Sequence, residues 1–346
     1  MRLSVLDQST IVSGRSPDAS IRESLGLARH CEALGYARYW LAEHHNTDSQ
    51  AGTAPEILIA AIAATTSRIR VGSAGVMLPH YASLKVAEQF RVLEAIAPGR
   101  IDLGLGRAPG SDGRTAYALN PNAETAAEHV PAQVAEILDW LAGRTPAENH
   151  PFHGVRAQPE GPTIPEVWML GSSDYGAKVA AYFGLPYCFA YFITDGQGAP
   201  EALEIYRRNY RPSLRHPEPI AALCVFAVAA PTEEEAEPLF LSRALWRLNR
   251  DRGVFPPLPS PEEAAAYPYT EAEQARIERM RARMLAGSAP RVAERLRSLA
   301  QDLKVDEIAI LTATHDPDAR RRSYSLLAQE FSLNARGSAP CISARA

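Results

Sequence analysis

The chain has 346 residues, of which 46% are hydrophobic and 22% are charged, and its formal net charge is −4. A chain of this length and composition can bury a large core, and it fits either two domains or one large α/β barrel. The negative charge argues against nucleic acid or an anionic membrane as the main partner. No apolar run approaches the roughly 18 residues that a membrane span needs.

The cysteines suggest a reducing compartment. Three of the four (Cys31, Cys188 and Cys224) lie among apolar residues, Cys341 lies near the C-terminus, and no pair has the spacing of a metal site. We therefore expect the first three to be reduced thiols in the core. The first residues form a strand-like segment without a signal-peptide pattern, so we expect a cytoplasmic enzyme.

Strand and helix signals alternate from one end of the chain to the other. Strands are predicted at residues 3–7, 38–42, 69–76, 101–106, 166–170, 186–191, 220–229 and 307–311. Helices are predicted near residues 20–34, 55–65, 84–97, 130–141, 175–183, 199–210 and 316–335. Eight such units predict an α/β fold of the (β/α)8 TIM barrel type, with residues 1–336 as one domain and 337–346 as a flexible tail.

Local signals predict where the helices begin and end. Ser20 and Glu23 have the spacing of a capping box, and Gly35 is a typical helix stop. Pro55 suits the first turn of the second helix, and Asp316 suits the cap of the last. Asp174 is a plausible cap for the helix that follows the fifth predicted strand.

One region interrupts the repeat after the seventh predicted strand. The connection at about residues 231–288 far exceeds the usual length of about 4–6 residues, and it holds acidic helical stretches around a Pro-rich centre. An insertion at the C-terminal end of a barrel strand lies over the barrel mouth, which favours a lid. A helical decoration or an oligomer contact is an equally good interpretation.

The segment Glu43-His44-His45 follows the second predicted strand, where a barrel carries its chemistry. Imidazole suits proton transfer near neutral pH, and a His pair also raises the possibility of a metal site. Adjacent residues on extended backbone point to opposite faces, and no further ligands are spaced to join them, so we predict no metal site. A structural, hydrogen-bonded pair remains the alternative to catalysis.

Two more strand ends carry features that suit a phosphate. Arg107 follows the fourth predicted strand, and its fixed charge favours an anion. Gly171, Ser172 and Ser173 follow the fifth, where the N-terminus of a helix has free N–H groups. A nucleotide-binding fingerprint is excluded at residues 104–110, because Pro109 replaces its third glycine, and no GxSxG motif supports a serine hydrolase.

Four motifs in this order resemble the bacterial luciferase-like flavin-dependent monooxygenases. They are WLAEHH at residues 40–45, VGSAGVMLP at 71–79, GRIDLGLGR at 99–107 and MLGSS at 169–173. The segment 106–112 resembles the non-luminescent, luciferase-like oxidoreductases of this family. The light-emitting subunit carries a reactive cysteine where this chain has Gly106, so light emission is not implied.

The resemblance implies roles for single residues. His44 matches the catalytic histidine, while Glu43 lines the flavin side of the barrel or serves as a structural carboxylate. Ala74-Gly75 matches a non-proline cis peptide against the flavin ring, although tight packing would also explain small residues there. Arg107 and Ser173 match phosphate-binding positions, with Gly106, Gly171 and Ser172 beside them. Three further aromatic side chains can be interpreted equally well as lining a substrate pocket or as packing in the core: Tyr81, Tyr191 and Phe192.

The implied reaction uses reduced FMN, supplied by a separate flavin reductase, and O₂. A flavin C4a-(hydro)peroxide would oxidise an aldehyde, ketone or aromatic substrate. The family often forms homodimers, so a homodimer is expected. An F420-dependent dehydrogenase on the same barrel, or a flavin binder without catalysis, are the alternatives.

Overall fold

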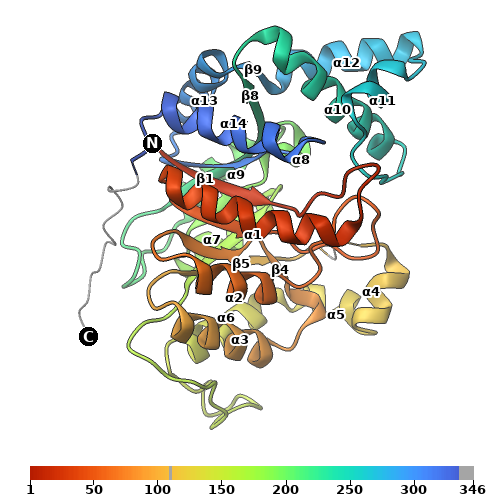
Figure 1. The fold of residues 1–346 in the computed structure, drawn as a ribbon. Helices are drawn as coiled ribbons and strands as arrows, with labels where there is room; N and C mark the ends of the chain where they lie inside the picture. Colours follow the sequence, from red (N-terminus) through yellow and green to blue (C-terminus); the bar gives the residue numbers. More distant parts are fainter. Residues whose placement is uncertain (109–110, 335–346) are drawn as a thin grey trace.

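Eight parallel strands close into a barrel in the order β10-β1-β2-β3-β5-β6-β7-β8, and β8 pairs again with β10 (Figure 1). The structure is a computed structural model that describes residues 1–108 and 111–334. The barrel strands are β1 (Arg2–Asp7), β2 (Arg38–Leu41), β3 (Arg70–Ser73), β5 (Ile101–Gly106), β6 (Glu166–Gly171), β7 (Tyr187–Phe189), β8 (Ala221–Ala230) and β10 (Glu307–Leu311). The predicted TIM barrel is thus confirmed.

Helices surround the barrel and extend beyond one end of it (Figure 1). Those that follow barrel strands are α1 (Pro17–Leu34), α2 (Pro55–Thr65), α3 (Ser83–Ile96), α6 (Val130–Leu141), α7 (Asp174–Phe183), α9 (Ala199–Asn209), α13 (Ala289–Leu303) and α14 (Pro317–Glu330). Shorter elements are the strand β4 (Val76–Met77), a 3₁₀ turn at Leu78–His80, α4 (Gly113–Leu119), α5 (Ala123–Glu128) and α8 (Tyr191–Thr194). No helix in the described part of the chain is long and apolar enough to cross a membrane.

The strands read as continuous apolar runs because both of their faces are covered. Side chains such as Trp40, Trp168 and Phe226 fill the barrel interior, while Val5 and Ile310 pack outward against helices. Parallel sheets buried on both faces have this composition. The three cysteines expected in the core (Cys31, Cys188 and Cys224) are buried and free, as predicted.

A buried ion cluster lies where the barrel strands begin. Arg38 Nη1 lies 2.9 Å from Asp102 Oδ2 and 2.7 Å from Glu166 Oε2, and its Nε lies 2.9 Å from Glu307 Oε1. The indole of Trp40 donates to Asp102 as well. Because catalytic groups of TIM barrels lie at the opposite, C-terminal end, this cluster has a structural role.

Two predicted helix starts were wrong. The first helix begins at Pro17 with Ser16 as its N-cap, and Ser20 lies inside it, donating instead to the carbonyl of Thr10. Proline at a first helical position is favoured because its φ is already helical, which outweighs the capping-box pattern further on. Ser173, not Asp174, is the N-cap of α7.

Two predicted strands are shorter than expected. The third stops at Ser73 and resumes as β4 after a cis peptide bond at Ala74–Gly75. The sixth ends at Phe189, and Tyr191 opens α8. Apolar composition alone does not distinguish a strand from the short helix after it.

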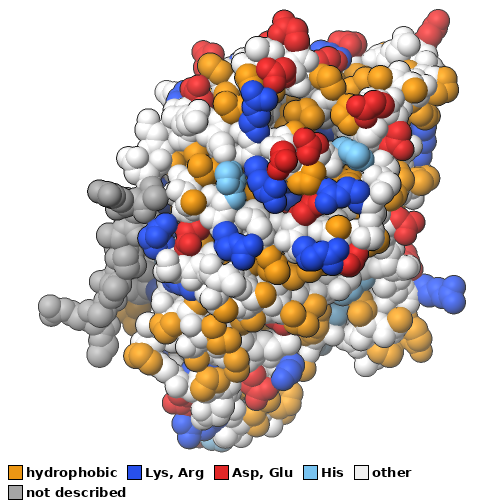
Figure 2. Space-filling model, viewed as in Figure 1, with side chains coloured by type: hydrophobic (Ala, Val, Ile, Leu, Met, Phe, Trp, Pro, Cys, Tyr) orange, Lys and Arg blue, Asp and Glu red, His pale blue; other side chains and the backbone are white. Residues whose placement is uncertain are grey.

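The insertion after β8 forms α10 (Glu233–Asp251), α11 (Pro261–Ala266), α12 (Glu271–Arg283) and β9 (Leu285–Ser288). These helices lie together beyond the barrel (Figure 1), and β9 pairs with the far end of β8. Basic and acidic side chains are interspersed on the face of the molecule in Figure 2. The predicted tail at 337–346 and Cys341 lie outside the described residues.

Candidate active site

Glu43 is buried in the loop after β2 and accepts from three donors. Its Oε1 lies 2.6 Å from the hydroxyl of Tyr81 and 2.8 Å from Nε2 of His45, and its Oε2 accepts from the backbone N–H of Met77 at 3.0 Å. The residue is 1% exposed. With three donors on its two oxygens, the carboxylate fixes three chain segments relative to each other.

His44 lies next to this carboxylate but is bound differently. Its backbone N–H donates to Gly52, whereas its buried Nδ1 has no hydrogen-bond partner among the described residues. Burial lowers the pKa of the imidazole to about 4; the charge of Glu43 opposes this, and Arg250 and His45 add to it. The ring is therefore neutral near pH 7.

The loop that carries His44 is fastened to α4. Asn46, with a φ of 50°, donates from its side-chain amide to Asp112 Oδ2 at 3.1 Å and to Thr115 Oγ1 at 2.9 Å. Asp112 in turn caps α4 through the backbone N–H groups of Arg114 and Thr115. Sequence analysis missed Asn46 and Asp112, because a contact across 66 residues leaves no local pattern.

The next strand end has the cis peptide at Ala74–Gly75 that the resemblance led us to expect. A Cβ on Gly75 would lie 2.7 Å from the carbonyl oxygen of Gly104 and 2.9 Å from Leu170 Cδ1. Packing of this turn against β5 therefore requires glycine at position 75. Tight packing accounts for the glycine at this position, and the match to a flavin-facing turn stays a prediction.

The two features that were predicted to bind phosphate lie at the ends of β5 and β6. Arg107 Cζ lies 4.0 Å from the ring centroid of Tyr175, in the first turn of α7. Ser173 caps that helix without a hydrogen bond from its own hydroxyl, and the carboxylate of Asp174 is engaged by Lys178 at 2.5 Å. An exposed guanidinium thus lies beside the first turn of α7, where the helix N-terminus favours an anion.

The glycines at these ends are not required by packing. A Cβ on Gly106 or on Gly171 would have no neighbour closer than 3.7 Å. A Cβ would fit at either position in ordinary van der Waals contact, so packing alone does not explain these glycines. Gly171 and Ser172 are only partly buried, and Gly106 likewise, so all three are accessible from outside.

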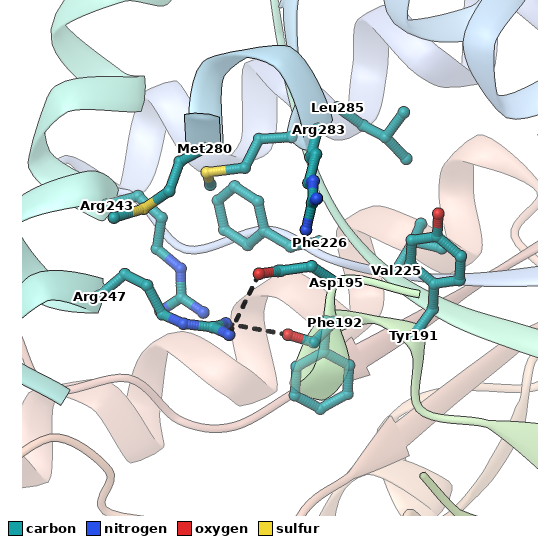
Figure 3. A pocket seen from close by; sticks show the side chains of 11 residues that line it. Tyr191, Phe192, Asp195, Val225, Phe226, Arg243, Arg247, Met280, Arg283 and Leu285 are labelled. Atoms are coloured by element: carbon teal, nitrogen blue, oxygen red, sulfur yellow. Dashed lines mark hydrogen bonds and ion pairs between the residues drawn. The ribbon is translucent and has the colours of Figure 1, made fainter. Parts of the chain in front are cut away.

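Tyr191 and Phe192 line a separate pocket, whereas Tyr81 does not. The pocket lies between α8, β8, α10, α12 and β9 (Figure 3). Phe226 and Val225 of β8 form its floor together with Leu285 of β9. The structure thus brings two of the three predicted aromatics together, and it places Tyr81 beside Glu43.

Sequence analysis missed the arginines of this pocket. Arg243 and Arg247 of α10 and Arg283 of α12 line it, and Arg250 lies one turn beyond Arg247. The spacing 243, 247 and 250 on an otherwise apolar helix face was the available signal. Within the described residues, no group of three or more His, Cys, Asp and Glu side chains could hold a metal ion.

Taken together, the chain is a TIM barrel with polar side chains at the C-terminal ends of β2, β5 and β6 and a cis peptide bond after β3, and these four strands are successive in the barrel. The model of the luciferase-like monooxygenase family matches residues 1–307, and the chain belongs to this family. It is 43% identical to the uncharacterized protein YceB of Bacillus subtilis over 96% of this chain and 99% of that protein. It is 40% identical to the luciferase-like monooxygenase of Escherichia coli K12 over 93% and 95%.

The similarity extends to a relative that is named for its activity and to solved structures. N-acetyl-S-alkylcysteine monooxygenase of B. subtilis is 37% identical over 94% of this chain and 97% of its own. The structure of apo-MsnO8 has a TM-score of 0.88 at 37% identity, over 97% and 99%. More distant barrels are solved with FMN, as in 3,6-diketocamphane monooxygenase at 18% identity, or with an F420 adduct, as in a secondary alcohol dehydrogenase at 12%.

Proposed function

We propose that this chain is a monooxygenase that uses reduced FMN and O₂ to oxidise a small organic substrate such as an aldehyde, ketone or aromatic compound. The observation that carries the proposal is the neutral imidazole of His44 in the loop after β2, whose buried Nδ1 has no hydrogen-bond partner among the described residues. A neutral imidazole with a free acceptor is the group that general acid–base chemistry near pH 7 requires.

The residues present fit FMN. Arg107 and the N-terminus of α7, with Ser172 and Ser173, would hold its phosphate. The bare backbone at Ala74–Gly75, together with Gly106 and Gly171, would leave room for a flat ring beside the strand ends. When bound, the reduced flavin supplies the electrons with which one atom of O₂ is transferred to the substrate.

The chain itself would manage the proton. The ring of His44 would accept a proton or a hydrogen bond, because burial keeps the imidazole neutral and a neutral imidazole has one acceptor nitrogen. Glu43 acts here as a positioning residue, since its oxygens already accept from Tyr81, His45 and Met77. Its negative charge also counteracts the burial of His44.

The insertion would serve as a lid that excludes water. Arg250 of α10 acts electrostatically on His44, which supports a position of this helix close to the barrel mouth. Water exclusion matters because an open site loses reactive intermediates to side reactions. A separate flavin reductase, a homodimer and a cytoplasmic location complete the proposal.

Titration of the purified protein with FMN and with riboflavin tests the cofactor assignment. We expect FMN to bind more tightly than riboflavin, and Arg107→Gln to reduce FMN affinity about tenfold or more while leaving riboflavin unchanged, because a charge-assisted contact is lost. Arg208→Gln, which removes an exposed charge from α9, is the control.

A parallel titration addresses the rivals. Tighter binding of F420 than of FMN would contradict the proposal in favour of an F420-dependent dehydrogenase. FMN binding without substrate-dependent O₂ uptake would instead indicate a flavin binder without catalysis.

A further inference from the structure

Three arginines of α10 form a row along one face of the lid. Arg243, Arg247 and Arg250 are spaced by four and three residues, which places them one above the other on a helix. Arg243 and Arg247 line the pocket between the lid and β8, and Arg283 of α12 points into it from the other side (Figure 3). The pocket therefore has a surplus of positive charge.

Arg243 is buried without a counter-ion. It is 4% exposed, and its guanidinium lies over the rings of Phe226, at 4.7 Å from the centroid, and Trp246, at 4.2 Å. No carboxylate or other hydrogen-bond acceptor among the described residues pairs with it. Burial, together with Arg247 and Arg250, lowers the pKa of this guanidinium to about 9. A buried charge without a partner is expensive, so it calls for an anion.

The acidic group in the pocket wall is already paired with another arginine. Asp195 Oδ2 lies 3.4 Å from Arg247, which also donates to the backbone carbonyls of Phe192 and Ile193 and lies 3.5 Å from Asp251 (Figure 3). Arg247 thus fastens α10 to α8. Arg243 and the exposed Arg283 remain for a ligand, since neither side chain is engaged by a carboxylate of the described residues.

The rest of the wall is apolar. Tyr191, Phe192, Phe226, Met280 and Leu285 surround the charged end of the pocket. A pocket of this kind fits a molecule with an apolar body and one anionic group, because the body is buried while the anion meets the guanidinium.

We propose that the pocket between α8, β8, α10 and α12 binds the carboxylate or sulfonate of an organic anion, with Arg243 as its anchor and Arg283 as a second contact. The inference deepens the proposed function, on which it rests in taking this anion to be the substrate. The guanidinium of Arg243 packs against two aromatic rings, and its planar set of N–H donors matches the two oxygens of a carboxylate. Substrate binding would then act directly on the lid, because its helices α10 and α12 supply both contacts.

Calorimetric titration with hexanoate and with hexanamide, in the absence of flavin, tests this. The two probes share an apolar body and differ in charge. We expect wild-type protein to prefer hexanoate at least tenfold. Arg243→Met should abolish that preference, whereas Arg243→Lys, which keeps the charge but not the fork, should retain part of it. Arg279→Met, which removes an exposed charge from the same lid, should bind like wild type.

Other outcomes overturn the inference. They are absence of hexanoate binding, equal affinity for hexanoate and hexanamide in wild type, or an equal loss in Arg279→Met. A selective loss of FMN over riboflavin affinity in Arg243→Met would show that the pocket holds the cofactor phosphate instead. Arg283→Met, at an exposed position, should weaken hexanoate even where Arg243→Met fails to fold. Because no flavin is present, failure of the monooxygenase proposal would leave the hexanoate result interpretable.

Discussion

His44 and Glu43 are sequence neighbours that meet different surroundings. The carboxylate is surrounded by donors, whereas the imidazole Nδ1 has none among the described residues. The motif and its place after the second strand could be read from the sequence, because strand ends are marked by local patterns. The donors to Glu43 could not, since Met77 and Tyr81 lie 34 and 38 residues further along the chain.

The pH dependence of His44 follows from this arrangement. We expect an NMR titration of the free protein to give a His44 pKa well below 6.5, near the value of about 4. Glu43→Gln should lower it further, because the negative charge that favours the imidazolium is removed. A His44 pKa at or above 6.5, or an upward shift in Glu43→Gln, would contradict the account. His129→Ala, an exposed imidazole, serves to confirm the resonance assignment and should leave the His44 titration unchanged.

The lowered pKa of His44 also makes the free energy of unfolding depend on pH. The folded protein holds His44 neutral where the unfolded chain would protonate it, between about pH 4 and 6.5. The unfolded state therefore binds more protons in that window, and the free energy of unfolding falls as the pH is lowered through it. His44→Phe should lose this part of the pH dependence.

At the scale of elements, the insertion after β8, which we propose as a lid, depends on a few contacts that join distant segments. Its helices were predicted from their acidic first turns and spacing, and α10 and α12 lie close to the predicted stretches. Sequence could not show that β9 pairs with β8, because a four-residue strand has no distinctive pattern. The short helices α4 and α5 were missed for the same reason.

Arg247 connects α10 to α8 through hydrogen bonds, and their contribution to stability can be tested. Arg247→Met removes its bonds to Phe192, Ile193 and Asp195, and we expect a loss of about 1–3 kcal/mol in local stability. Hydrogen exchange should therefore become faster in α10 while the barrel strands keep their rates. Unchanged exchange in α10, or equal acceleration in Arg279→Met, would show that this tie does not hold the lid.

At the scale of the molecule, the barrel was predictable because eight apolar strands alternate with helices. The interactions at the point where the barrel strands begin were not predictable from the sequence. Arg38, Asp102, Glu166 and Glu307 meet inside the barrel from positions up to 269 residues apart. Their charges look like exposed residues in the sequence, and only the closed sheet brings them together. The role of two glycines in β3 and β5 was equally hidden in the sequence. Gly72 and Gly104 let two backbones approach where any Cβ would collide.

The central claim is that this barrel transfers oxygen with a proton carrier at His44. Oxygen consumption and ¹⁸O incorporation from ¹⁸O₂ test it most directly, with FMN, a separate flavin reductase and a panel of aldehydes, ketones, aromatics and organic acids. We predict substrate-dependent oxygen uptake with one ¹⁸O atom in the product. In His44→Ala, turnover should fall by about 10²–10⁴-fold while FMN affinity is retained. Product without ¹⁸O, or full turnover in His44→Ala, would contradict the account.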